Sequence, residues 1–277
     1  MGSSQSKESS IKQLYHTLVF SKEDRTASHG IEIKQFLQDI EREILNPDTR
    51  NSITQEMLSY RGLEALSTAL TWENMNDITH PEEIQAAAFK IWIIICESFP
   101  SPGKVPPDLL SDAILRKLNN LAFSKMQEHV EIGVRALVYL SKFKEIKEKL
   151  MGISIINTFT LLSAASEMKR ATRIKAITGI YNLASGSGSE LLQTGAISTI
   201  LDMLRSPEFL HGPEDPTWYL IETLAMAAED DFVRQRLVHE KAIKIFKEKL
   251  LDKNTKAAAA SAIRVMCKSS EARNEIK

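Results

Sequence analysis

The sequence predicts an all-α protein built from repeated helical units. Glycine and proline are few, at 11 and 9 of 277 residues, whereas sandwiches, barrels and doubly wound sheets need many turn glycines. An apolar helical pattern also recurs along the chain. Its central small or apolar residues are 45, 43, 44 and 39 residues apart, at Ala88, Gly133, Ala176, Leu220 and Ala259. A period of this length is typical of α-solenoids.

Each repeat is predicted to be a short helix, a second helix and a longer third helix. The second helices lie in apolar segments that begin at Gly62, Asp112, Gly152, Gly195 and Lys241. Short helices are expected before most of them, over residues 51–59, 145–151, 190–194 and 232–239. Loops are expected where proline, glycine and serine cluster, at residues 100–107, 185–189 and 207–216.

A further helical segment precedes the first repeat. Its apolar residues approximate the 3.6-residue helical period, at Ile31, Ile33, Phe36, Leu37, Ile40 and Ile44. Because a first repeat needs its outer face covered, residues 11–50 are predicted to be an N-terminal cap. The expected organisation is a flexible tail over residues 1–10 and one helical domain over 11–277, with the repeats in 51–277.

The junction of the third and fourth repeats resembles armadillo-repeat proteins. Residues 176–186 read AITGIYNLASG, similar to the third-helix pattern A-L-x-A-L-x-N-L-A-x-G. Residues 191–197 read LLQTGAI, similar to the I-x-x-G-A-I that begins the next repeat, and residues 270–276 resemble the first helix of another repeat. The resemblance covers roughly residues 50–277. It implies a right-handed armadillo-type α-solenoid of about five three-helix repeats behind an N-terminal helical cap.

The resemblance also implies a surface for a protein partner. In armadillo solenoids the third helices line a concave groove, and two inward positions per helix, commonly Trp and Asn, hold an extended peptide. Those positions are occupied here by Lys90, Ile94, Arg135, Tyr139, Thr178, Asn182, Glu222, Met226, Ser261 and Val265. Only Asn182 keeps the asparagine, and Trp92 and Trp218 lie out of register, which argues against a simple basic peptide as the ligand. Arg135 and Tyr139 are the expected anchors, because Arg and Tyr are enriched at interface hot spots.

The amino terminus carries a lipidation pattern. Residues 1–6 read MGSSQS and fit the N-myristoylation motif M-G-x-x-x-[ST], with Gly2 as the acylated residue. Residues 1–7 also resemble the start of Src-family kinases, which implies lipidation only. Expression tags begin with the same four residues, but no histidine run follows. One myristoyl chain binds membranes marginally, so a reversible tether is expected.

The near-neutral net charge of −1 conceals an uneven distribution. Residues 232–277 hold 12 Lys and Arg against 5 Asp and Glu, whereas residues 1–231 hold 23 against 31. The basic end could face anionic lipid or an acidic partner segment, or it could be ordinary solvated helix faces. Few aromatic residues interleave with these charges, so nucleic-acid binding is not expected.

The sequence holds no recognisable catalytic or metal-binding motif. P-loop, zinc-protease and nucleophile-elbow patterns do not occur, and none of the six histidines has a ligand at metal-binding spacing. Carboxylate pairs such as Asp230 and Asp231 fall at predicted helix starts, where they complement the helix dipole. We therefore expect neither catalysis nor a cofactor nor a metal ion.

These observations predict a non-enzymatic adaptor. A myristoyl chain on Gly2 would tether the solenoid to a membrane, and the solenoid would bind a protein partner there. The two cysteines lie in apolar helical segments, which indicates reduced thiols and a cytoplasmic protein. With the tether at Gly2, the protein is expected partly at the cytosolic face of a membrane. The alternative is a soluble armadillo-type regulator without a lipid anchor, such as a chaperone co-factor or a GTPase regulator.

Overall fold

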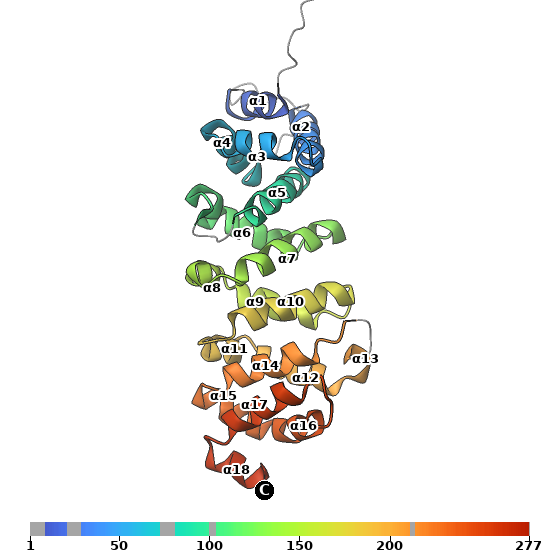
Figure 1. Cartoon of the computed structure of the whole chain (residues 1–277), viewed down its shortest axis with the longest axis vertical. Helices are drawn as coiled ribbons and strands as arrows, with labels where there is room; N and C mark the ends of the chain where they lie inside the picture. Colours follow the sequence, from blue (N-terminus) through green and yellow to red (C-terminus); the bar gives the residue numbers. More distant parts are fainter. Residues whose placement is uncertain (1–8, 21–28, 73–80, 100–103, 211–213, 277) are drawn as a thin grey trace, which may run out of the picture. The chain divides into compact units, whose positions relative to one another are not determined.

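The computed structural model describes residues 9–20, 29–72, 81–99, 104–210 and 214–276. Every regular element in these ranges is helical, and none is a strand (Figure 1). The chain divides into two compact units, residues 1–136 (unit 1) and 137–277 (unit 2). Among the helices described, none is both long and apolar enough to cross a membrane.

Unit 1 combines the N-terminal helices with the first two predicted repeats. Its α-helices are α1 (Ser10–Tyr15), α2 (His29–Leu45), α3 (Arg50–Met57), α4 (Tyr60–Leu70), α5 (Pro81–Glu97), α6 (Asp112–Leu121) and most of α7 (Gln127–Ser141). A π-helical turn (His16–Phe20) and a 3₁₀ turn (Pro107–Leu110) complete the unit. Helices α1 and α2 pack on α4 and α5, with Ile33, Leu37 and Ile40 fully buried. The assignment of residues 11–50 as a cap stays a prediction.

Helix α5 forms the centre of unit 1. Trp92 is fully buried on it, and the indole Nε1 donates a hydrogen bond of 2.9 Å to the carbonyl oxygen of Leu109. Gln85 Nε2 donates a 2.7 Å bond to the carbonyl oxygen of Trp72. Each bond satisfies a polar group that would be costly to bury unpaired. Cys96 is buried on the same helix.

Unit 2 contains the remaining three repeats. Its helices are a 3₁₀ turn (Lys144–Ile146), α8 (Lys147–Gly152), α9 (Ile155–Ala164), α10 (Arg170–Leu183), α11 (Gly188–Gln193), α12 (Ala196–Arg205), α13 (Pro207–Leu210), α14 (Thr217–Ala227), α15 (Asp231–His239), α16 (Ala242–Lys249), α17 (Lys256–Met266) and α18 (Ser270–Ile276). Third helices pack side by side here, α10 on α14 and α14 on α17. Aliphatic and aromatic residues of all three repeats fill the core of the unit.

The predicted repeat register is confirmed at its central positions. All five lie on third helices, α5, α7, α10, α14 and α17, and all five are buried. The short first helices occur at α3, α8, α11 and α15, within a few residues of the predicted bounds.

Two predicted loop boundaries are wrong. Gly188 is already part of α11, so the connection after α10 is shorter than residues 185–189. Residues 207–210 form the short helix α13 inside the predicted loop 207–216. Pro207 stands at the first helical position, where the missing N–H has no intrahelical acceptor to lose and the ring fixes φ near its helical value.

The second helices of unit 2 start from an unusual backbone conformation. The residue before each has a positive φ, 58° at Ser154, 76° at Gly195 and 56° at Lys241. Ser154 is therefore the counterpart of Gly195, and the predicted alignment of Gly152 with Gly195 is two residues out. Gly152 is the last residue of α8.

In unit 1 the second helices begin differently. Ser59 and Ser111 have extended backbone, and their hydroxyls accept hydrogen bonds from the N–H groups of Gly62 (3.3 Å) and Ile114 (3.5 Å). These are ordinary serine N-caps. Gly62 thus lies inside α4, and a Cβ there would be 2.6 Å from backbone atoms of Met57.

Candidate protein-binding surface

The predicted groove residues all lie on third helices. Nine of the ten keep at least part of their surface exposed, namely Lys90, Ile94, Arg135, Tyr139, Thr178, Asn182, Glu222, Met226 and Ser261. Val265 is only 5% exposed and offers little surface to a partner. Their role in binding stays a prediction.

In unit 1 the charged groove residues are engaged in ion pairs. Lys90 Nζ lies 2.7 Å from Glu128 Oε1. Partial burial pulls the pKa of Lys90 down, but the hydrogen bond with Glu128 and the charge of Glu41 raise it overall. Arg135 Nη2 donates to both carboxylate oxygens of Glu97, at 3.1 and 3.0 Å. Arg135 is thus less available as an anchor than its residue type indicates.

In unit 2 the groove residues carry rings and an amide. The Tyr139 ring packs edge-on against Phe143, with centroids 5.2 Å apart. Asn182 Nδ2 donates a 2.9 Å hydrogen bond to Ser141 Oγ, which joins α10 to α7. The Thr178 hydroxyl turns back to the carbonyl oxygen of Ile174 at 3.1 Å.

An aromatic cluster beside Asn182 is the feature that the sequence prediction missed. The rings of Tyr181, Trp218 and Tyr219 lie 5.0–5.4 Å apart, centroid to centroid, across α10 and α14. Trp218 keeps 36% of its surface exposed. Partial burial, and then the charge of Glu222, raise the pKa of the Tyr181 phenol. The sequence signal for this cluster was the adjacent Trp218 and Tyr219 in a chain with few aromatic residues. Trp218 was not counted among the groove residues because it lies out of register with the inward positions of armadillo third helices.

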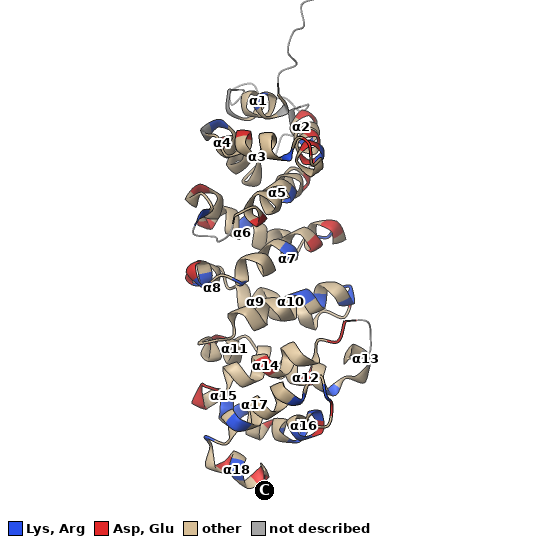
Figure 2. Ribbon diagram, in the orientation of Figure 1, with Lys and Arg blue, Asp and Glu red and all other residues tan. Residues whose placement is uncertain are grey.

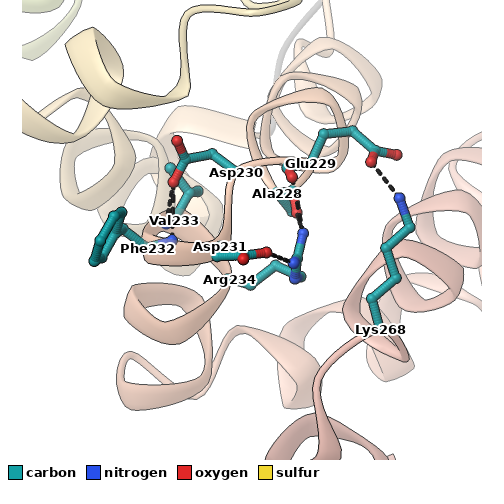
Figure 3. Close-up of polar contacts among 8 residues, drawn as sticks. All are labelled: Ala228, Glu229, Asp230, Asp231, Phe232, Val233, Arg234 and Lys268. Atoms are coloured by element: carbon teal, nitrogen blue, oxygen red, sulfur yellow. Dashed lines mark hydrogen bonds and ion pairs between the residues drawn. The ribbon is translucent and has the colours of Figure 1, made fainter.

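A polar network holds the start of α15 at the end of α14 (Figure 3). Asp230 Oδ1 accepts hydrogen bonds from the N–H groups of Phe232 (2.8 Å) and Val233 (3.1 Å), so the predicted helix-start role of this carboxylate is confirmed. Arg234 donates to the carbonyl oxygens of Ala228 (2.6 Å) and Glu229 (2.9 Å). The Phe232 ring points away from this network and is 70% exposed.

A Ser–His–Glu group in unit 1 has a structural explanation. Ser124 Oγ donates to Glu82 Oε2 at 2.7 Å and lies 3.3 Å from His129 Nδ1. The same oxygen accepts a hydrogen bond from the Met126 N–H at 3.2 Å, just before α7 begins. These contacts fix the connection between α6 and α7. Over the described residues, no group of His, Cys, Asp and Glu is arranged to hold a metal ion.

Sequence and structure comparisons give different results. No protein-family model matches the sequence, and neither does any curated protein. Among solved structures, the chain is similar to computationally designed armadillo repeat proteins for modular peptide recognition, with TM-score 0.68, 17% identity, and coverage of 92% of this chain and 99% of the other.

Two further solved structures show the same likeness. A designed armadillo repeat protein in complex with the peptide (KR)4 is similar with TM-score 0.66, 15% identity, and coverage of 94% of this chain and all of the other. An engineered protein matches with TM-score 0.66, 16% identity, and coverage of 92% and 97%. At such identities the likeness concerns the fold alone. The chain has the armadillo-type α-solenoid fold, as the resemblance of residues 176–186 and 191–197 to the armadillo pattern predicted.

Proposed function

We propose that this protein is a non-enzymatic adaptor that binds an extended segment of a protein partner through the third helices of unit 2. We also propose that a myristoyl chain on Gly2 tethers it reversibly to the cytosolic face of a membrane. Gly2 lies outside the described residues, so the tether rests on the sequence motif. The function requires no cofactor and no metal ion.

The aromatic cluster beside Asn182 is the observation that carries the binding proposal. Tyr and Trp are enriched at interface hot spots because large rigid rings bury much area at a low entropic cost. Trp218 keeps a third of its surface open, and the rings of Tyr181 and Tyr219 hold it in place. Glu222, one turn after Trp218 on α14, adds a carboxylate to the same surface.

Asn182 supplies the hydrogen bonds that an extended backbone needs. A carboxamide has two N–H donors and one carbonyl acceptor. Within the described chain, its one hydrogen bond uses a single donor, to Ser141 Oγ. The second donor and the carbonyl oxygen remain for the N–H and C=O of a bound peptide, and the Ser141 contact fixes the amide orientation in advance.

The structural comparisons support this proposal at the level of the fold. One structure that resembles this chain is of computationally designed armadillo repeat proteins for modular peptide recognition, and another is of a designed armadillo repeat protein in complex with the peptide (KR)4. Peptide binding is therefore compatible with an armadillo-type fold. The residues that would select the peptide differ here, so its sequence is a separate question.

A peptide library tests the binding surface. Peptides selected on the wild-type protein should bind Trp218→Ala and Asn182→Ala at least tenfold more weakly, with unchanged circular dichroism. Phe232→Ala is the matched control, because it removes another exposed aromatic ring that lies on a first helix. Selected peptides that bind Trp218→Ala and wild type equally would refute the proposed surface.

Two measurements test the tether. After co-expression with an N-myristoyltransferase, intact-mass spectrometry should show a myristoyl group on wild type and none on Gly2→Ala. The acylated wild type should float with phosphatidylcholine vesicles more than the variant does. Identical flotation of the two proteins would refute the proposed tether and favour the alternative, a soluble regulator without a lipid anchor.

A further inference from the structure

A pocket in unit 2 is lined by arginine side chains at the opposite end of α10 from Asn182. It has a volume of about 510 Å³. Its lining residues belong to the end of α9, the connection before α10, the first turns of α10, helix α12 and the short helix α13. Its walls include Arg170, Arg173, Asp202 and Phe209. With a rise of 1.5 Å per residue, Arg170 and Asn182 are roughly 18 Å apart along α10.

Phe209 of α13 holds both guanidinium groups in place. The Arg173 guanidinium carbon lies 4.6 Å from the centre of the Phe209 ring, and that of Arg170 lies 5.8 Å from it. Arg170 Nε and Nη2 donate to the carbonyl oxygen of Phe209 at 3.3 and 3.1 Å. Arg170 Nη2 also reaches the carbonyl oxygen of Glu214 at 2.7 Å, and Arg173 Nε donates to that of Ser163 at 2.7 Å. Both side chains are therefore oriented before any ligand arrives.

The outer nitrogen atoms of this arginine pair have no protein acceptor in the described chain. Arg170 Nη1 and both terminal nitrogens of Arg173 make no hydrogen bond, and neither arginine forms an ion pair there. Asp202, the carboxylate of the pocket, is paired with Arg205 at 3.1 Å. Two positively charged side chains that line the pocket thus keep several N–H donors with no hydrogen-bonded anion in the described chain.

The position on the helix makes this arrangement unfavourable without a ligand. Both arginines lie near the N-terminus of α10, whose first turn holds no acidic residue, and Figure 2 shows that end in blue. The positive end of the helix dipole repels cations. Partial burial and the charge of Arg170 lower the pKa of the Arg173 guanidinium, and Glu167 offsets this only in part.

We propose that the Arg170–Arg173 pocket binds a phosphate monoester carried on a serine or threonine of a protein segment. A phosphorylated side chain bears a charge of about −1.5 to −2 and three acceptor oxygens, so it can neutralise both guanidiniums, whereas a carboxylate neutralises one. Guanidinium groups suit phosphate because their planar donors bind two oxygens at once. The hydroxyls of Ser166, Thr199 and Ser206 offer further donors at the pocket wall.

The partial burial of both arginines favours a peptide side chain over a membrane surface. Phe209, which stacks under both guanidiniums, is only 6% exposed. Surfaces that bind anionic lipid usually present exposed basic residues outward. A phosphorylated side chain can enter the pocket while its backbone stays outside. This site does not depend on the third-helix surface proposed above.

Phosphorus NMR with a short peptide tests the proposal. The probe is the pentapeptide Ala-Ala-phosphoserine-Ala-Ala, titrated into the full chain to millimolar concentration. Its resonance should shift and broaden with wild type. Loss of one charge-assisted contact should weaken binding about tenfold to a hundredfold in Arg173→Gln and Arg170→Gln. Lys175→Gln is the matched control, because it removes one exposed positive charge from the same helix outside the pocket.

Two further variants separate binding from folding. Arg173→Lys keeps the charge but loses the planar donors, so it should fold as wild type and bind more weakly. Phe209→Leu keeps an apolar side chain but loses the ring beneath the guanidiniums, and it should also weaken binding. A circular dichroism melt confirms that each variant is folded.

Four outcomes would overturn the proposal. The probe could fail to bind wild type, or Lys175→Gln could weaken binding as much as Arg173→Gln. Ala-Ala-Glu-Ala-Ala could bind as well as the phosphopeptide, which would assign the pocket to carboxylates. Arginine-dependent binding to phosphatidylcholine vesicles containing phosphatidic acid, without peptide binding, would assign it to lipid.

Discussion

Units 1 and 2 share the helical triplet but present different third-helix surfaces. In unit 1 the exposed charges are paired, Lys90 with Glu128 and Arg135 with Glu97. In unit 2 the corresponding helices carry the aromatic cluster and the partly unused amide of Asn182. The same stacking thus allows one surface whose charges are paired within the unit and another with exposed rings and a partly unused amide, where we propose that a partner binds.

The two units also differ in how their second helices begin. Unit 1 uses serine side chains to cap the first N–H groups, as at Ser59. Unit 2 uses a residue with a left-handed backbone conformation and no side-chain cap, as at Ser154, Gly195 and Lys241. The armadillo resemblance is strongest around Gly195, because glycine is the residue type expected at a left-handed backbone position and can therefore be recognised in the sequence.

The largest effect is expected where a glycine allows close packing in unit 2. A Cβ at Gly179 would lie 2.4 Å from the buried Phe159 ring. Gly179→Ala should lower the free energy of unfolding by about 1–3 kcal/mol, because the ring must move in a filled core. Urea unfolding followed by circular dichroism measures this. Gly152→Ala is the control. Gly152 ends a helix, and a Cβ added there would meet no atom of a non-neighbouring residue within 4 Å, so this variant should not destabilise the protein.

Exchanging residues at the left-handed positions should give effects of opposite sign. Gly195→Ala puts a Cβ at φ 76° and should cost about 1 kcal/mol, whereas Lys241→Gly removes one at φ 56° and should gain a similar amount. Thermal unfolding of both variants checks the signs. A stabilising Gly195→Ala would contradict the left-handed start of α12.

Two serines before second helices should respond differently to alanine. Ser59→Ala loses the cap to the Gly62 N–H and should cost about 1 kcal/mol. Ser154 makes no cap hydrogen bond, and alanine tolerates its φ of 58° little worse than serine does, so Ser154→Ala should change stability much less. Equal losses in chemical denaturation would mean that the two units start their second helices in the same way.

The smallest effect is expected from the ion pair in unit 1. The hydrogen bond with Lys90 lowers the pKa of Glu128 below its usual value. The contribution of the Lys90–Glu128 pair to the free energy of unfolding is therefore present above the pKa of Glu128 in the unfolded chain, and it is lost as pH falls through the lower pKa of the folded state. Because Glu128 is mostly exposed and solvent screens the pair, Glu128→Gln should cost no more than about 0.5 kcal/mol at pH 7. The difference from wild type should vanish in strong acid, as pH-dependent unfolding can show.

The repeat register was predictable because burial is periodic. An apolar or small residue recurs at each central position where third helices pack, as at Ala88, Ala176 and Leu220, and this recurrence can be read from the sequence. The start of α9 was not predictable, because the turn between two helices imposes the left-handed conformation of Ser154. Serine is not typical of left-handed backbone, whereas the glycine at position 195 is, so the sequence gives no sign of this conformation at Ser154.

The candidate sites could not be predicted in full, because they depend on contacts between side chains that the spacing of residues in the sequence does not reveal. Arg135 has the residue type of an anchor, but its pairing with Glu97 depends on how α7 lies against α5. Trp218 was set aside for its register, yet its ring joins that of Tyr181 from the neighbouring repeat. Phe209 meets Arg173 only because residues 207–210 turn into a helix within a predicted loop.

The two cysteines provide a built-in chemical reporter for each unit. Thiol reagents attack the thiolate, and burial, with the nearby Glu97, raises the pKa of Cys96 far above that of a free thiol. Cys267 follows α17 in unit 2 and is half-buried. A maleimide dye should therefore label Cys267 in the native protein, and Cys96 only when α5 opens. The rate of the second labelling reaction would time the opening of unit 1 without any engineered residue.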